Sequence, residues 1–93
     1  MQYDKTIKRG ETAQMNEKLY KAVISGQSDN NINFNDFRNL IVDLGFEFKN
    51  QKGSHISYVN RSINEVMNIQ ADGNKAKAYQ VRQLRNIINT HNL

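Results

Sequence analysis

The 93-residue sequence contains no cysteine. It therefore has no disulfide, no thiolate nucleophile and no thiolate metal site, which is typical of a reducing compartment. Long apolar runs are also missing, because the N-terminal segment lacks the hydrophobic stretch of a signal peptide and nothing is long enough to cross a bilayer. These absences predict a soluble, cytoplasmic protein with no contact to a membrane.

The chain is also too short for two hydrophobic cores. One core becomes viable near this length, so we expect one compact fold whose site lies on an exposed face. Enzymes that bind a large cofactor between two lobes are disfavoured. We expect neither a cofactor nor a metal.

Basic residues outnumber acidic residues by 13 to 9, which gives a net charge of +4. The excess lies in the second half, where Glu65 and Asp72 are the only acidic residues after position 49. This asymmetry suits a polyanionic partner, because neutralised phosphates release condensed counterions. An ordinary solvated surface explains the charge equally well, so charge alone does not decide.

Apolar residues recur at helical spacing in three segments. The first is a short amphipathic helix over about 15–24, which ends at Ser25 and Gly26. The clearest is 34–44, where Asn33 can cap the first turn and Gly45 can take the left-handed conformation that ends a helix. The third closes the chain and buries four residues, Val81, Leu84, Ile87 and Ile88. Residues 1 to about 14 lack a clean period and are expected to be loosely held.

Between the second and third helices the period changes to two, which predicts strands. One strand begins at Phe46 and Phe48, a polar turn covers 50–54, and a second strand covers 55–59. After a turn at 60–62, Ile63, Met67 and Ile69 share one face of a third strand, in which Glu65 predicts a bulge or an edge position. Residues 71–77 are expected to be a basic, glycine-containing loop.

The predicted fold class is therefore α+β, a two-layer sandwich with the order helix, three antiparallel strands, helix, and one additional N-terminal helix. Both helices of the sandwich pack on one sheet face. The other face and its turns remain free for a site.

Two histidines differ in context. His91 ends the last helix, where we expect it to be exposed and structural or incidental. His55 enters a strand directly after Lys52, Gly53 and Ser54, which places a group that titrates near neutral pH beside a cation and a hydroxyl. A lone histidine in a strand is more often a packing or surface residue than a catalyst.

The sequence around His55 resembles a known family. The resemblance is carried by Phe37, Leu40, Leu44-Gly45-Phe46, Gly53-Ser54-His55, Asn68-Ile69-Gln70, Asp72-Gly73, Lys77, Tyr79-Gln80-Val81 and Leu84. In this combination, over about residues 33–90, the chain resembles the HicA toxins, the mRNA interferases of type II HicA/HicB toxin-antitoxin systems. It departs from many of them at Ile56, where they carry a second histidine.

The resemblance implies a double-stranded-RNA-binding-like fold in an RNA-cleaving domain over 33–93, with 1–32 as an N-terminal extension. It also implies a catalytic role for His55 and a HicB-type antitoxin as partner, and it favours cleavage of mRNA without the ribosome. RNA carries its own nucleophile, so the scheme needs only a base and positive charge at the phosphate, and no metal.

In that scheme His55 takes the proton of the 2′-hydroxyl, while Lys52 and the amides around Gly53 and Ser54 stabilise the phosphorane. The products are a 2′,3′-cyclic phosphate and a 5′-hydroxyl. The group that protonates the leaving oxygen stays open between Lys52, Tyr58 and water.

Lys75 and Lys77 precede the last helix, where they can hold a flanking phosphate or simply be solvated. Tyr58 and Tyr79 can stack on bases, but packing is the favoured role for both. Two other classes remain open: a non-catalytic double-stranded-RNA-binding module, and a structural adaptor without nucleic acid.

Overall fold

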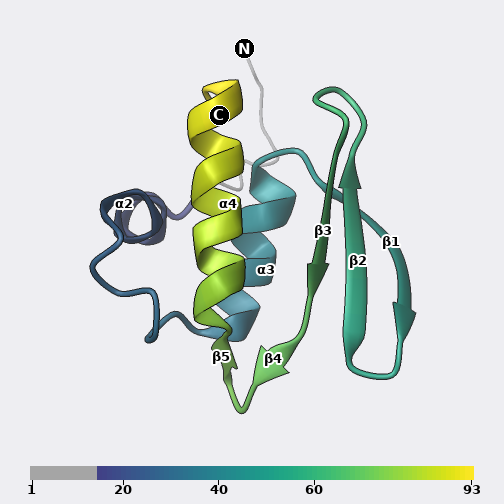
Figure 1. Ribbon diagram of the computed structural model, residues 1–93, viewed down its shortest axis with the longest axis horizontal. Helices are drawn as coiled ribbons and strands as arrows, with labels where there is room; N and C mark the ends of the chain where they lie inside the picture. The colour runs from purple at the N-terminus through teal and green to yellow at the C-terminus, as the bar shows by residue number, and fades with distance from the viewer. Residues whose placement is uncertain (1–14) are drawn as a thin grey trace.

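Three helices and two antiparallel sheets make up residues 15–93, the part of the chain that the computed structural model describes (Figure 1). The helices are α2 (Glu17–Ser25), α3 (Phe34–Asp43) and α4 (Ala78–His91). One sheet has the strand order β1 (Glu47–Lys52), β2 (His55–Asn60), β3 (Glu65–Ile69), and the other pairs β4 (Ala71–Asp72) with β5 (Lys75–Ala76). The predicted α+β class is confirmed. The expectation for residues 1–14 lies outside the described residues.

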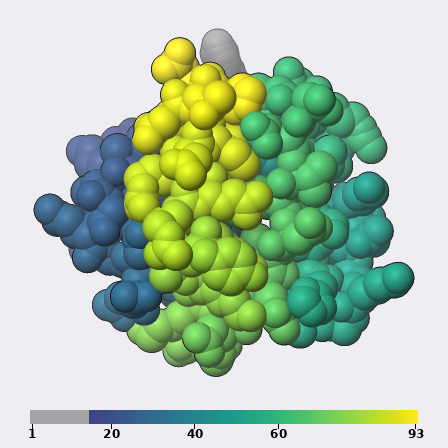
Figure 2. Space-filling model, in the orientation of Figure 1, coloured from purple at the N-terminus to yellow at the C-terminus, as the bar shows by residue number. Residues whose placement is uncertain are grey.

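Figure 1 shows α3 and α4 on the same side of the three-stranded sheet. Helix α2 contacts both of them from the side away from the sheet. In the space-filling view α4 forms a ridge between α2 and the strands (Figure 2). Over residues 15–93 no helix covers the other face of the sheet, and no helix is long and apolar enough to cross a membrane.

The predicted ends of α3 are confirmed. The Oδ1 atom of Asn33 accepts a hydrogen bond from the backbone nitrogen of Asp36 at 3.0 Å, which caps the first turn. At the other end Gly45 has a φ of +102°, and the nitrogen of Phe46 donates to the carbonyl of Ile41 at 3.2 Å. This reversal places Phe46 back on the helix and starts the sheet.

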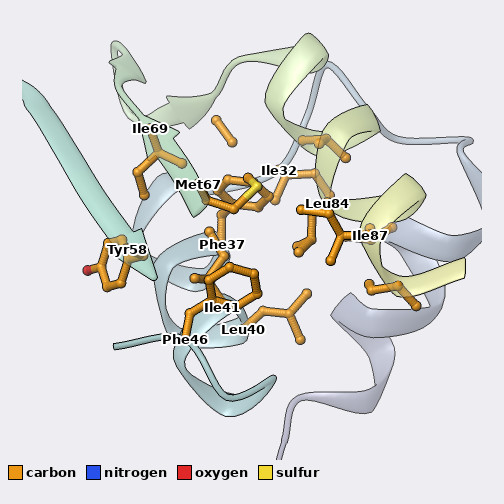
Figure 3. Close-up of a cluster of buried hydrophobic side chains, with 14 of the residues drawn as sticks. Ile32, Phe37, Leu40, Ile41, Phe46, Tyr58, Met67, Ile69, Leu84 and Ile87 are labelled. Carbon is orange, nitrogen blue, oxygen red and sulfur yellow. The ribbon is translucent and has the colours of Figure 1, made fainter. Parts of the chain in front are cut away.

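The core lies between the helix layer and the inner face of the sheet (Figure 3). Phe37 of α3 and Met67 of β3 are fully buried at its centre. The inward residues of β2, Ile56 and Tyr58, are also buried, and Val23 joins the same cluster from α2. Residues from all three helices and the sheet therefore share one core.

The third strand begins two residues later than predicted. Ile63 lies in a turn, because Asn64 takes a φ of +57° and reverses the chain before Glu65. Glu65 lies in β3, an edge strand, as one of the two expected alternatives. The β-bulge occurs instead in β1, between Phe48 and Asn50.

Two further predictions are wrong in detail. The expected loop 71–77 contains the β4–β5 hairpin, whose two-residue strands are too short to give a periodic pattern. The expected polar turn 50–54 is shorter, because Lys52 still pairs with His55 across the β1–β2 hairpin. Phe48 lies in β1, as the predicted strand requires, and its side chain is 57% exposed.

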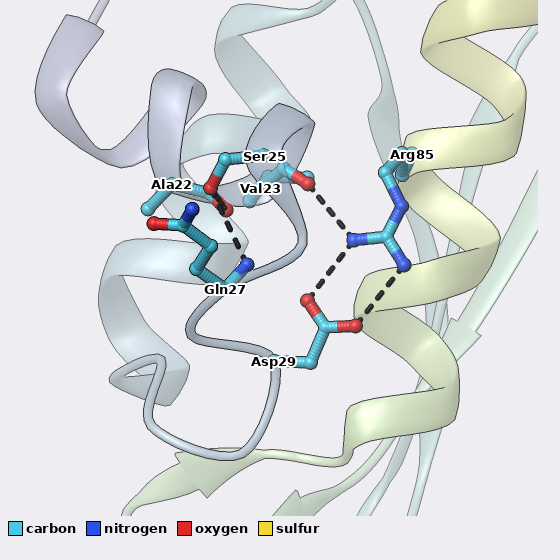
Figure 4. A network of polar contacts seen from close by, with 6 residues as sticks. All are labelled: Ala22, Val23, Ser25, Gln27, Asp29 and Arg85. Carbon is cyan, nitrogen blue, oxygen red and sulfur yellow. Dashed lines mark hydrogen bonds and ion pairs between the residues drawn. The ribbon is translucent and has the colours of Figure 1, made fainter.

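A clamp around Arg85 fixes the segment between α2 and α3 to α4 (Figure 4). The guanidinium donates to both carboxylate oxygens of Asp29 at 3.0 Å and to the carbonyl of Val23 at 3.0 Å. The hydrogen bonds to Asp29 raise the pKa of Arg85 above its ordinary value. Gly26 passes so close that an added Cβ would lie 3.1 Å from the guanidinium, and its φ of +74° favours glycine.

We expect Arg85→Ala to lower the free energy of unfolding by about 1–3 kcal/mol, because it leaves the largely buried carboxylate of Asp29 without its cation. Urea denaturation measures this loss. Arg85→Lys is the control, since it keeps the positive charge but not the bidentate hydrogen bonds to Asp29. Its loss of stability should be smaller than that of Arg85→Ala. Equal stability of Arg85→Ala and wild type would show that the clamp does not hold the fold.

Candidate functional site

The strand register places His55 on the open face of the sheet. Side chains alternate along β2, so burial of Ile56 and Tyr58 turns His55 and Ser57 to the other side. His55 is exposed and lies opposite Lys52 in the β1–β2 pairing. Directly paired residues have Cβ atoms about 4.5–5.5 Å apart, so the imidazole and the ammonium share this face.

A tight turn connects this pair. Gly53 has a φ of +58°, a conformation that favours glycine, and its carbonyl accepts a hydrogen bond from Nε2 of Gln51 at 2.9 Å. Ser54 follows as the second residue of the turn. The predicted group of Lys52, Gly53, Ser54 and His55 is thus brought together at one end of the sheet.

Gln70 connects this turn to the start of α4. Its Nε2 atom donates to Oγ of Ser54 at 2.9 Å, and its Oε1 atom accepts from Nζ of Lys77 at 2.9 Å. Ser54 and Lys77 are 23 positions apart in the sequence, yet one side-chain amide bridges them. The structure therefore joins Lys77 to the His55 turn.

A buried amide holds Gln70 in place. The side chain of Gln80 is 1% exposed, and its Oε1 atom accepts from the backbone nitrogen of Gln70 at 3.3 Å. Its Nε2 atom approaches the carbonyl of Asn68 and the hydroxyl of Tyr79, both at 3.4 Å. Gln80 thus ties the end of β3 to the first turn of α4.

Lys75 points elsewhere. Its Nζ atom donates to Oδ1 of Asn31, and its backbone forms a β-bridge with Asn33 at the start of α3. The two lysines were predicted as a pair that can hold one flanking phosphate. The structure joins only Lys77 to the turn that carries His55.

Tyr58 and Tyr79 also lie in different environments. Tyr58 is 3% exposed on the inner face, where its hydroxyl accepts from Nε of Arg38 at 3.2 Å and its ring meets Phe48 edge-on at 6.0 Å. Packing is confirmed for Tyr58, and its position across the sheet removes it as an acid beside His55. Tyr79, for which packing was also favoured, is 55% exposed.

His91 has a structural contact. Its Nε2 atom lies 2.9 Å from Oε2 of Glu65, and both side chains are partly buried. The pair fastens the end of α4 to β3. The expected exposure of His91 is therefore wrong, while its structural role agrees with this contact.

The site lies on an open surface. Two depressions lie on the helical side, one between α2 and the start of α3 and the other between α3 and Tyr58. Neither includes His55. Lys52, Ser54 and His55 are all exposed, so a ligand there is held from one side, which suits an extended polymer better than a small molecule.

Sequence reasoning missed the roles of Gln70 and Gln80. One signal was present for Gln70, since it follows Asn68 by two residues, directly after the end of β3, and the strand alternation would turn both toward the outer side. Gln80 directly precedes Val81, the first residue of the predicted apolar face of the last helix. The sequence therefore showed a polar residue next to this buried face. The contacts of both amides depend on the tertiary fold.

Comparison with known proteins gives no relative. No protein-family model matches the chain, and neither a curated protein nor a solved structure is similar to it.

We expect Gln80→Leu to lower the free energy of unfolding by about 1–3 kcal/mol, because two partly buried backbone groups, the nitrogen of Gln70 and the carbonyl of Asn68, lose their hydrogen-bond partner. Hydrogen exchange should report the local effect, with faster exchange at the amide of Gln70 than the global loss of stability explains. Gln83→Leu, at an exposed position of α4, is the matched control. Unchanged exchange at Gln70 would contradict the role of Gln80.

Proposed function

We propose that this protein is an endoribonuclease of the HicA toxin type that cleaves mRNA without a metal, with His55 as general base. The supporting observation is the exposed His55 opposite Lys52 and next to the Ser54–Gln70–Lys77 contacts. Helix α3, the three strands of the larger sheet and α4 also follow the order of a double-stranded-RNA-binding-like fold, with the short β4–β5 hairpin between β3 and α4. Residues 33–93 form the RNA-cleaving part in this proposal.

In the proposed reaction His55 takes the proton of the RNA 2′-hydroxyl as that oxygen attacks the neighbouring phosphorus. The bond from phosphorus to the 5′-oxygen then breaks, leaving a 2′,3′-cyclic phosphate and a 5′-hydroxyl. Lys52, Lys77 and the donors around Gly53 and Ser54 stabilise the charge of the phosphorane. Lys52 or water supplies the proton to the leaving oxygen.

The proposed partner is a HicB-type antitoxin that covers the basic face around His55. A free ribonuclease in the cytoplasm stops translation and growth, so such a protein needs an inhibitor. The open surface around His55 is accessible to a protein as well as to RNA.

The test of this function is His55→Ala. The imidazole is exposed, so the variant should keep the wild-type melting temperature, while RNA cleavage falls by about two to four orders of magnitude. RNA binding should persist. Expressed in bacteria, the wild type should arrest growth and the variant should not. Cleavage at the wild-type rate by folded His55→Ala would remove His55 from the mechanism, and wild-type binding without cleavage would favour a non-catalytic binding module.

Lys77 and Lys75 form a matched pair for RNA affinity. Lys77→Ala should weaken binding and lower the slope of log affinity against log salt by about one unit, because one phosphate contact is lost. Lys75→Ala changes the net charge equally but lies beside Asn31, so its slope should change less. Equal changes of affinity and salt slope in the two variants would show that RNA binding depends only on the net charge of the protein.

A further inference from the structure

The side-chain amide of Gln70 has one possible orientation. The ammonium of Lys77 can only donate hydrogen bonds, so the oxygen of the amide must face it. The nitrogen of the amide then faces Ser54 and donates to the hydroxyl oxygen. Lys77 therefore decides the direction of the hydrogen bond that Ser54 receives.

This direction leaves donors on both neighbours of Gln70. The Ser54 oxygen accepts from the amide, so its own hydrogen is free to point away from Gln70. The Lys77 ammonium uses one of its three N–H groups on Gln70. A hydroxyl donor and an ammonium donor are thus held on either side of one amide, and a phosphate oxygen accepts from both kinds of group.

The bridge is also attached to the core through Gln80. The side chain of Gln70 lies at a partly buried position, and the buried Gln80 fixes its backbone nitrogen. Ser54 directly precedes His55, so a displacement of the bridge also displaces the Ser54 hydroxyl relative to the imidazole. A misplacement of such groups by about 1 Å is enough to slow a reaction strongly.

We propose that Gln70 is a positioning residue, which holds the Ser54 hydroxyl and the Lys77 ammonium as a donor pair for a phosphodiester oxygen of RNA beside His55. This inference rests on the proposed function. Gln70 acts through its two neighbours and makes no contact with RNA itself. Ser54 and Lys77 make the contact.

Gln70→Glu separates this role from a purely structural one. The carboxylate has nearly the same shape and keeps both contacts, so the fold should be as stable as in wild type. However, a carboxylate only accepts hydrogen bonds. The Ser54 hydroxyl must then donate its hydrogen to the carboxylate at position 70, and the carboxylate neutralises the charge of Lys77. The donor pair is lost although the bridge remains.

The probe is a short single-stranded RNA with 2′-O-methyl groups, which can bind but cannot be cleaved. By fluorescence anisotropy we expect Gln70→Glu to bind it about tenfold more weakly, with a salt slope lower by about one unit. Gln83→Glu, on the exposed side of α4, carries the same change in net charge and should bind nearly as wild type does. Equal affinities of the two variants would overturn the proposal.

A double-mutant cycle with Gln70→Ala and Lys77→Ala gives an independent answer if Gln70→Glu does not fold. Because Gln70 acts through Lys77, its replacement should cost less affinity when Lys77 is already alanine. Strictly additive losses would overturn the proposal.

The two proposals fail differently. A wild-type protein that binds the probe but does not cleave unmodified RNA refutes the nuclease, while the comparison of Gln70→Glu with Gln83→Glu still decides the role of Gln70. A wild-type protein that cleaves unmodified RNA while Gln70→Glu and Gln83→Glu bind the probe equally refutes only the role of Gln70.

Discussion

The alternation of side chains along β2 is the constraint on which the rest of the structure depends. Ile56 and Tyr58 must enter the core to meet Phe37 and Met67, and this fixes which side of the strand is outside. A shift of the register by one residue would expose the apolar side chains and bury His55. Core packing, and not any contact of the imidazole itself, therefore places His55 on the open face.

Two buried polar side chains hold the ends of this sheet. Asn60, at the end of β2, donates to the carbonyl of Leu44 at 3.2 Å and accepts from the backbone and hydroxyl of Ser62. At the opposite end, where β3 meets α4, Gln80 likewise hydrogen-bonds backbone groups, the nitrogen of Gln70 and the carbonyl of Asn68. A buried amide is costly unless its hydrogen bonds are made, so each of them specifies one local arrangement of the chain. The end held by Gln80 is the end that carries the candidate site.

The sequence predicted elements with strong local signals. The Asn33 cap and the Gly45 reversal of α3 depend on neighbouring residues, and both were predicted correctly. The start of β3 was not, because Ile63 continues the apolar pattern while the backbone of Asn64 breaks the strand. A pattern of side chains does not report a left-handed residue of this kind.

The candidate site was predictable only in part. Lys52, Gly53, Ser54 and His55 are consecutive, and a hairpin brings them together wherever it forms. The bridge from Ser54 through Gln70 to Lys77 depends on how α4 meets β3, which no local pattern encodes. Lys75 and Lys77 look equivalent in the sequence, yet the short β5 strand and the start of α4 send them to different neighbours.

The bulge in β1 has a consequence for how separate molecules meet. β1 is an edge strand with all six residues exposed, so its unpaired backbone groups are open to a strand from another chain. The bulge between Phe48 and Asn50 breaks the regular spacing of these groups, and Lys49 and Lys52 add charge along the same edge. An incoming strand would have to match an irregular, charged border. The same strand that holds Lys52 opposite His55 thus also opposes edge-to-edge pairing at this border of the sheet.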